Sequence, residues 1–335
     1  MRTATAHFVD HLAALQPVLA AVPAAAEGLS TQAIFTVLFD RQLREKVGPG
    51  AYQQATEALR QYYRAVRLCR EEALPAAQAQ LQQADELLAA LPASVQHFVT
   101  LFHLSAWGNY YHKAGNAAQA VLLLHQGLVL SASLERQGYD LIYRRIEQLL
   151  NIGALYAQQQ RHACTHALLR NTLAFVHTGQ AEGLLIDDWD ATAMQRVRAY
   201  QEHTLDEVFA RLATQNTALL NHDEFGDEYH YAFYFRDLLA QLQPDTYNRT
   251  VLHNWLYVKA SYYEDGPAAF LDNVLTFVAD TEIAAEYGVF KANLLAQAHH
   301  HLRQRGEGAA QLAAIRAFAA HTLLDRKGRA VRLAA

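Results

Sequence analysis

The chain has 335 residues, of which 52% are hydrophobic and 18% are charged, and its formal net charge is −5. This balance provides neither the basic surface that binds nucleic acid nor a polybasic patch for a membrane, so we expect neither kind of partner. Two cysteines, Cys69 and Cys164, are too few for a disulfide framework and favour free thiols in a reducing compartment. The composition therefore predicts a cytoplasmic protein, and its few prolines and glycines favour helix over strand.

Residues 1–48 are expected to form an N-terminal helical cap. The segment LAALQPVLAAVPAAAE, residues 12–27, is apolar and ends in small residues, as a signal peptide does. However, Asp10 and His11 precede it and Pro17 interrupts it, which does not fit the three-part pattern of a secretory signal. No uninterrupted apolar run approaches the roughly 20 residues of a membrane span. We therefore expect a soluble chain in which this segment is part of the fold.

Between residues 49 and 178, apolar residues recur at three- and four-residue spacing, as in Leu59, Tyr62, Val66 and Cys69. No run shows the alternation typical of a strand. Short breaks that contain glycine or proline separate the periodic segments, at residues 47–50, 91–94, 113–116 and 177–183. Short connections between long amphipathic segments are typical of antiparallel helix neighbours. The pattern predicts an all-α fold built from helical hairpins.

The stretch SAWGNYYHKAGNAAQA, residues 105–120, has an informative order. Gly108 is followed three residues later by Tyr111, then by a glycine-containing turn and Ala120. A small residue on the first helix lets the second helix approach closely, and the aromatic ring fills the gap one turn further on. Ala120 and Gly127 are then expected to let the next hairpin stack against this one.

Neighbouring segments repeat this order. Gly153 and Tyr156 are three residues apart, Leu169 follows sixteen residues after Gly153, and Ala65 takes the place of the glycine upstream. The pattern resembles the tetratricopeptide repeat, although the repeats begin 43 and 45 residues apart at Ala65, Gly108 and Gly153, against about 34 in the standard repeat. Longer helices or longer turns are therefore expected.

The resemblance implies that the hairpins stack as a right-handed α-solenoid, with a concave groove lined by the first helix of each hairpin. In the tetratricopeptide family this groove commonly binds an extended peptide or a partner helix. The resemblance maps the groove onto six residues, which are Asn109, His112 and Lys113 in the clearest repeat, Tyr62 and Arg70 in the repeat before it, and Gln158 in the repeat after it.

Residues 179–247 are interpreted as an irregular helical insert with acidic clusters. The sequence DDWD, residues 187–190, is similar to part of the aspartate-rich motif of isoprenoid enzymes, but Ala191 stands where that motif requires aspartate. The preferred interpretation is a helix N-cap, in which an aspartate accepts the free amides of the first turn.

The second acidic cluster is NHDEFGDEYHY, residues 221–231. In a helix, Asp223, Asp227 and His230 would share one face, and carboxylate and imidazole ligands suit manganese, iron or zinc. The preferred interpretation is an acidic turn with solvated charges, because Gly226 favours a turn.

Residues 248–335 are expected to form degenerate hairpins of the same kind and a C-terminal cap helix. Here AHHHLRQR, residues 298–305, contains three consecutive histidines. Consecutive helical residues point about 100° apart, so the three rings cannot converge on one metal. His301 takes the place of the repeat's tyrosine, and we expect it to face a neighbouring helix together with Ala298.

The sequence contains no nucleophile elbow, phosphate-binding loop, dinucleotide fingerprint, HExxH or paired CxxC. We therefore expect a non-catalytic scaffold or adaptor that binds a protein or peptide and needs no cofactor. Two alternatives remain open. One is a metal-dependent all-α enzyme that uses the acidic and histidine residues of 187–230, and the other is a regulatory subunit that senses a peptide.

Overall fold

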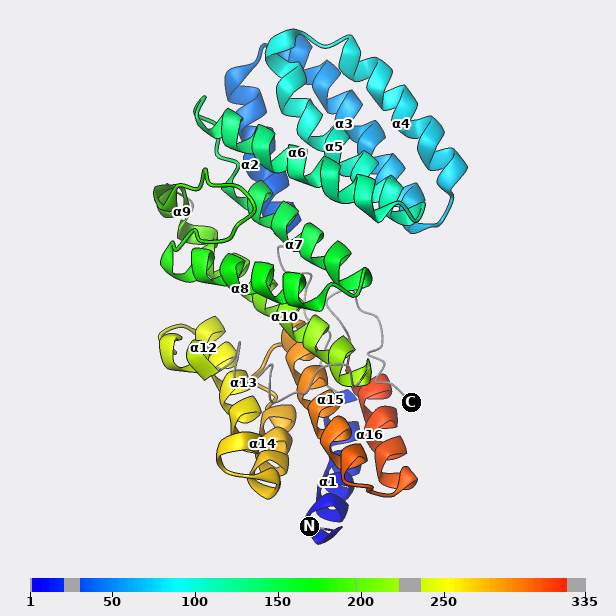
Figure 1. The fold of residues 1–335 in the computed structure, drawn as a ribbon, viewed down its shortest axis with the longest axis vertical. Coiled ribbons are helices and arrows are strands. Elements are labelled where there is room, and N and C mark those ends of the chain that lie inside the picture. Colours follow the sequence, from blue (N-terminus) through cyan, green and yellow to red (C-terminus); the bar gives the residue numbers. More distant parts are fainter. Residues whose placement is uncertain (1, 21–30, 197, 223–235, 324–335) are drawn as a thin grey trace. The chain divides into compact units, whose positions relative to one another are not determined.

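The computed structural model describes residues 2–20, 31–196, 198–222 and 236–323 (Figure 1). These residues form helices and contain no strand, which confirms the all-α prediction. The chain divides into two compact units, Leu29–Val208, here called the hairpin unit, and Met1–Gly28 with Phe209–Ala335, here called the terminal unit. The units do not follow the four regions drawn from the sequence, because residues 1–28 group with the C-terminal helices rather than with residues 29–48.

The hairpin unit contains most of the long helices. In chain order they are α2 (Thr31–Lys46), α3 (Pro49–Arg70), α4 (Leu74–Ala89), α5 (Ala93–Lys113), α6 (Ala117–Glu135), α7 (Ile142–Gln158) and α8 (His162–Thr178). After a loop follow α9 (Ala191–Arg196), the 3-10 turn η1 (Arg198–Tyr200) and the first part of α10 (Gln201–His222).

Three antiparallel hairpins, α3/α4, α5/α6 and α7/α8, dominate this unit (Figure 1). Each turn has three residues, and the middle one is left-handed: Glu72 (φ 62°), Gly115 (φ 82°) and Gln160 (φ 58°). The next amide then bonds to the carbonyl five residues back, as in Asn116 N to Tyr111 O at 2.8 Å. This closing pattern satisfies carbonyls that the end of a helix leaves free.

Close contacts within and between these hairpins occur at the small residues that the sequence singled out. A Cβ at Gly108 would lie 3.4 Å from Leu124 Cδ2 across the hairpin, and one at Gly153 would lie 3.5 Å from Leu169 Cδ2. A Cβ at Gly127 would lie 3.6 Å from the Gln148 side chain of the next hairpin. The predicted roles of these glycines in close packing are therefore confirmed.

Longer helices account for the wide repeat spacing. The six hairpin helices have 16 to 22 residues, and a six-residue connection, 136–141, separates α6 from α7. Among the described residues, α6 alone is long and apolar enough to cross a membrane. Several of its apolar residues, such as Leu124 and Leu128, are buried where α6 packs against α5 and α7, whereas Leu122 and Val129 are exposed.

The terminal unit combines both ends of the chain. Besides the second part of α10, its elements are α1 (Arg2–Ala20), α12 (Arg236–Gln241), α13 (Tyr247–Glu264), α14 (Pro267–Ala279), the 3-10 turn η3 (Ala285–Tyr287), α15 (Gly288–Gln304) and α16 (Ala309–Thr322).

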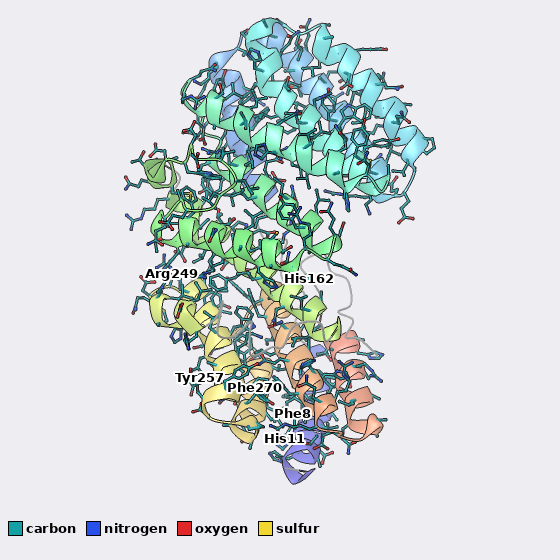
Figure 2. The ribbon with its side chains drawn as sticks, viewed as in Figure 1. Phe8, His11, His162, Arg249, Tyr257 and Phe270 are labelled. Atoms are coloured by element: carbon teal, nitrogen blue, oxygen red, sulfur yellow. The ribbon has the colours of Figure 1, made fainter. Side chains whose placement is uncertain are left out.

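Two further hairpins, α13/α14 and α15/α16, turn at short segments that contain glycine, residues 264–267 and 305–308. Helix α1 packs against α14 and α16. The rings of Phe8 on α1 and Phe270 on α14 are buried in this unit (Figure 2). The first helix of the chain is thus part of the core formed by the last ones.

Candidate functional site

Three of the six expected groove residues occupy one structural position. Arg70, Lys113 and Gln158 are the last residues of α3, α5 and α7, and all three are exposed. Basic side chains are favourable here because the carbonyl end of a helix carries partial negative charge. The three first helices of the hairpins therefore end in an equivalent, solvent-facing polar residue.

Asn109 and His112 lie within the last turns of α5 and are half-buried. The Asn109 Oδ1 atom is buried and has no hydrogen-bond partner among the described residues. Burial, and secondarily the charge of Lys113, lowers the pKa of His112 below its usual range, so its imidazole is neutral at pH 7. This end of α5 thus combines an amide acceptor, a neutral imidazole and an ammonium group.

The ends of α3 and α5 are close to one another. Helices α3 and α5 pack side by side, and Lys113 is near enough to Cys69 for its charge to oppose the rise that burial causes in the pKa of that thiol. Cys69 is completely buried and Cys164 is exposed, and both are free thiols. The C-terminal ends of α3 and α5 therefore lie near one another.

Tyr62 is the exception and requires a correction. Its side chain is 1% exposed, so it belongs to the core and cannot line an open groove. The hydroxyl donates to Asp85 Oδ1 on α4 at 2.7 Å, and burial together with this carboxylate raises the pKa of Tyr62. The ring faces inward because α3 packs against α4 and α5 on this side.

Asp85 is the centre of a polar cluster that the sequence did not reveal. His103 Nδ1 lies 2.7 Å from Asp85 Oδ1, and Trp107 Nε1 donates to Asp85 Oδ2 at 3.0 Å. Burial opposes ionisation of Asp85, but the hydrogen bonds from His103, Tyr62 and Trp107 outweigh it and hold its pKa below the usual range. One feature of the sequence could have indicated this cluster, because Asp85 directly follows Ala84, an apolar residue of α4.

The DDWD segment holds a loop in place. Asp190 caps α9, since its Oδ1 accepts from the Thr192 amide at 2.8 Å, as the N-cap interpretation predicts. Asp188 pairs with Arg136, and its carbonyl accepts from the buried Arg145. The Arg145 guanidinium also lies 3.9 Å from the centre of the Trp189 ring. Because of these contacts, we interpret residues 187–190 as a loop with a structural role.

The alternative metal ligands Asp223, Asp227 and His230 lie outside the described residues. Within the described ranges, no group of three or more histidine, cysteine, aspartate or glutamate side chains is placed to hold a metal ion.

The three consecutive histidines of α15 are buried and point in different directions, as helical geometry requires. His299 Nε2 lies 3.5 Å from Arg316, His300 Nδ1 lies 2.9 Å from the Leu220 carbonyl, and the His301 ring stacks on Tyr262 at 3.5 Å. Burial, with Arg316 next in importance, lowers the pKa of His299 to about 4. These histidines are structural.

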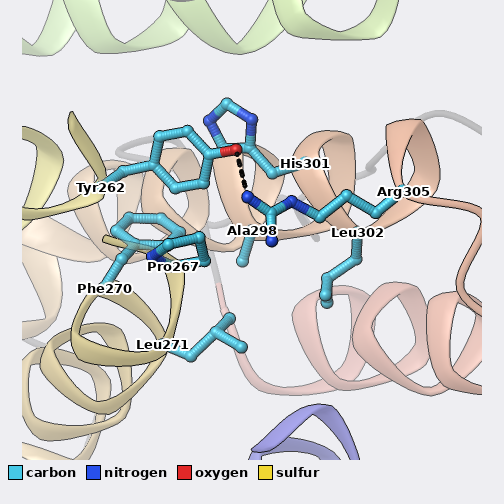
Figure 3. A pocket seen from close by; sticks show the side chains of 8 residues that line it. All are labelled: Tyr262, Pro267, Phe270, Leu271, Ala298, His301, Leu302 and Arg305. Atoms are coloured by element: carbon cyan, nitrogen blue, oxygen red, sulfur yellow. Dashed lines mark hydrogen bonds between the residues drawn. The ribbon is translucent and has the colours of Figure 1, made fainter. Parts of the chain in front are cut away.

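A shallow apolar pocket lies beside His301 (Figure 3). Its volume is about 260 Å³, part of it open to solvent. Pro267, Leu271 and Leu302 contribute to its wall, and Arg305 donates to the Tyr262 hydroxyl at 3.4 Å across its rim. Nothing in its lining provides the convergent polar groups of a substrate site.

A buried lysine in the terminal unit was also not predicted from the sequence. Lys259 Nζ on α13 donates to Asn216 Oδ1 at 2.9 Å, to Gln297 Oε1 at 2.8 Å and to Asn293 Oδ1 at 3.2 Å. Neutral amide oxygens from α10 and α15 thus stabilise a charge in the core. We interpret this cluster as structural.

No protein-family model, no curated protein and no solved structure matches the chain.

Proposed function

We propose that the chain is a non-catalytic scaffold or adaptor that binds a protein or peptide on the first helices of its hairpins. In this proposal the hairpin unit is a tetratricopeptide-like α-solenoid. The observation that carries it is the equivalence of Arg70, Lys113 and Gln158, which end three successive first helices and face solvent. Repeated positions that present different polar side chains are typical of a surface that reads an extended partner.

The end of α5 is the proposed centre of the binding surface. Asn109 offers a buried acceptor that no described residue uses, and the neutral His112 and the exposed Lys113 stand beside it. The exposed Lys113 can bind a carbonyl or carboxylate of a peptide, and the half-buried His112 stands next to it.

The test compares the native chain with a variant in which Asn109, His112 and Lys113 are all alanine. The control changes Gln82, Glu86 and Gln126 to alanine, because these exposed residues lie on the second helices α4 and α6. Each protein captures partners from a lysate of the source organism, and an enriched partner is then purified and titrated.

We expect native and control proteins to bind this partner equally and the site variant to bind it at least about tenfold more weakly. Hydrogen exchange in the complex should slow in the last turns of α5. Equal affinity of all three proteins, or protection confined to α4 and α6, would contradict the proposed surface.

A further inference from the structure

Three arginines form a row on the solvent side of α3. Arg60, Arg64 and Arg67 follow the i, i+4, i+7 spacing that places residues on one face of a helix. The Arg60 and Arg67 side chains are 69% and 68% exposed, and Arg64 is exposed as well. These three residues are called the arginine row below.

The repeat register shows which face of the hairpin the row occupies. When Ala65 of α3 is aligned with Gly108 of α5, the arginine row corresponds to His103, Trp107 and Tyr110. All three of these α5 residues contact α4: His103 and Trp107 bond to Asp85, and the Tyr110 hydroxyl donates to Gln78 Oε1 at 3.1 Å. On α5, therefore, this face receives the preceding helix.

The corresponding face of α7 is covered too. The equivalent residues there are Gln148, Ile152 and Leu155, and all are buried. Helix α7 packs along α6, which precedes it in the chain. Only on α3 does this face remain open among the described residues of the unit, although α5 and α7 use it to receive a helix.

The positive charge of the open face of α3 indicates that a helix covering it would carry negatively charged side chains. Arg64 makes no ion pair with any described residue. Arg60 and Arg67 pair only with residues close to them in sequence, Glu57 of α3 at 2.6 Å and Glu71 of the following turn at 3.7 Å. Exposed pairs of this kind contribute little to stability, so a partner's carboxylates can replace them. Guanidinium groups bind carboxylates through two parallel hydrogen bonds.

We infer that the arginine row is a docking site for a helix of a partner protein that carries carboxylates along one face. This helix occupies on α3 the place that α4 occupies on α5, where α4 also delivers a carboxylate, Asp85. The row spans about 10 Å, or two turns, which matches acidic residues spaced i, i+4, i+7. The inference does not depend on the proposed groove edge.

An acidic helix fits this face better than nucleic acid does. The chain as a whole has a net charge of −5, and Glu57 and Glu71 lie at the two ends of the row. Phosphate backbones require an extended positive surface, whereas a helix with centrally placed carboxylates needs only the three guanidinium groups.

The probe is a synthetic helical peptide of about 20 residues with glutamates on one face, long enough to be helical in water. A second peptide of the same composition has its glutamates distributed around the helix. The row variant is R60Q, R64Q and R67Q, which keeps good helix formers. The matched control is R41Q, R136Q and R161Q, which makes the same change in net charge at exposed arginines elsewhere in the unit.

Binding is measured by fluorescence anisotropy at physiological salt, and circular dichroism checks that each variant is folded. We expect the one-face peptide to bind the native and control proteins and to bind the row variant at least about tenfold more weakly. The distributed peptide should bind the native protein more weakly than the one-face peptide. The variant of Asn109, His112 and Lys113 should bind the one-face peptide normally, which separates this site from the groove edge.

Three results would overturn the inference. The native protein could bind both peptides equally, or the row variant could bind the one-face peptide as tightly as the native protein does. Either result would mean that any acidic chain binds non-specifically. No measurable binding of the one-face peptide would mean that the row only caps the open end of the hairpin array with a polar face. Tighter binding of a DNA duplex, lost in the same row variant, would assign the face to nucleic acid.

Discussion

The first and second hairpins meet around a carboxylate, whereas the second and third meet around a guanidinium. Between α4 and α5 the centre is Asp85, which accepts hydrogen bonds from three side chains. Between α5 and α7 the centre is Arg144, which is buried and bonds to Glu147 at 2.6 Å, to the Leu101 carbonyl at 3.4 Å and to Ser105.

Comparing these two interfaces shows which contacts recur in successive hairpins of this chain and which contacts differ between them. In the repeat register Asp85 corresponds to Leu128 of α6, which is completely buried and apolar. The close contacts of Gly108 with Leu124 and of Gly153 with Leu169 are the same in both hairpins. The contacts of small residues therefore recur within each hairpin, whereas the buried polar residues differ from one interface between hairpins to the next.

The largest expected effect comes from removing the guanidinium centre. The change Arg144→Ala leaves Glu147 and the acceptors on α5 without their donor in a buried site, so we expect a loss of about 3 kcal/mol in the free energy of unfolding. Arg144→Met, which keeps the packing volume, should lose less. Urea denaturation measures both, and equal losses would mean that the lost hydrogen bonds and ion pair, with no contribution from packing volume, account for the whole effect.

A smaller effect should follow from overfilling the shared close contact. Gly153→Val pushes two extra methyl groups toward Leu169, and we expect a loss of about 2 kcal/mol. Gly153→Ala should be neutral or slightly stabilising, because a Cβ there is at ordinary contact distance and alanine favours helix. The same pair of changes at Gly108, followed by thermal denaturation, should give the same ranking. A different ranking would show that the two hairpins are not equivalent.

The carboxylate centre should contribute less, since the Asp85 side chain is 32% exposed. We expect Asp85→Asn to cost about 1 kcal/mol at pH 7, because the amide cannot accept all three hydrogen bonds. Its folded-state pKa is below that of the unfolded chain, so the stabilisation is present above pH about 4 and is lost as the pH falls through the folded value. Native protein should lose more stability than the variant between pH 5 and pH 3, and parallel pH profiles would contradict this assignment.

The smallest effect concerns the left-handed turn residues. Gln160→Gly relieves the left-handed strain of a residue that has a side chain, and we expect a gain of about 0.5 kcal/mol. Gly115→Ala introduces that strain in the preceding hairpin and should cost about 1 kcal/mol. Thermal denaturation compares the two, and shifts of the same sign would refute the equivalence of the turns.

The spacing of apolar, glycine and proline residues along the sequence predicted the helices and turns of the hairpins, but little of the buried polar contacts between them. The predicted breaks at residues 91–94 and 113–116 coincide with the ends of helices because proline, glycine and short polar runs end helices through local geometry. Burial of Tyr62 and Arg144 was not predictable, because Tyr62 bonds to Asp85 on another helix and Arg144 bonds to Ser105, 39 residues away. Helical periodicity identifies a face but not its partner, and it gave no sign that α1 packs with α14 and α16.

The three left-handed turns divide the row of hairpins α3/α4, α5/α6 and α7/α8 at equivalent positions. Glu72, Gly115 and Gln160 have nearly the same backbone geometry and are each followed by the second helix of a hairpin. Removing residues 73–115, or duplicating them, would rejoin the chain at a turn of the type already present and leave no new loop to optimise. A change in the number of hairpins would therefore require new helix interfaces but no new type of turn.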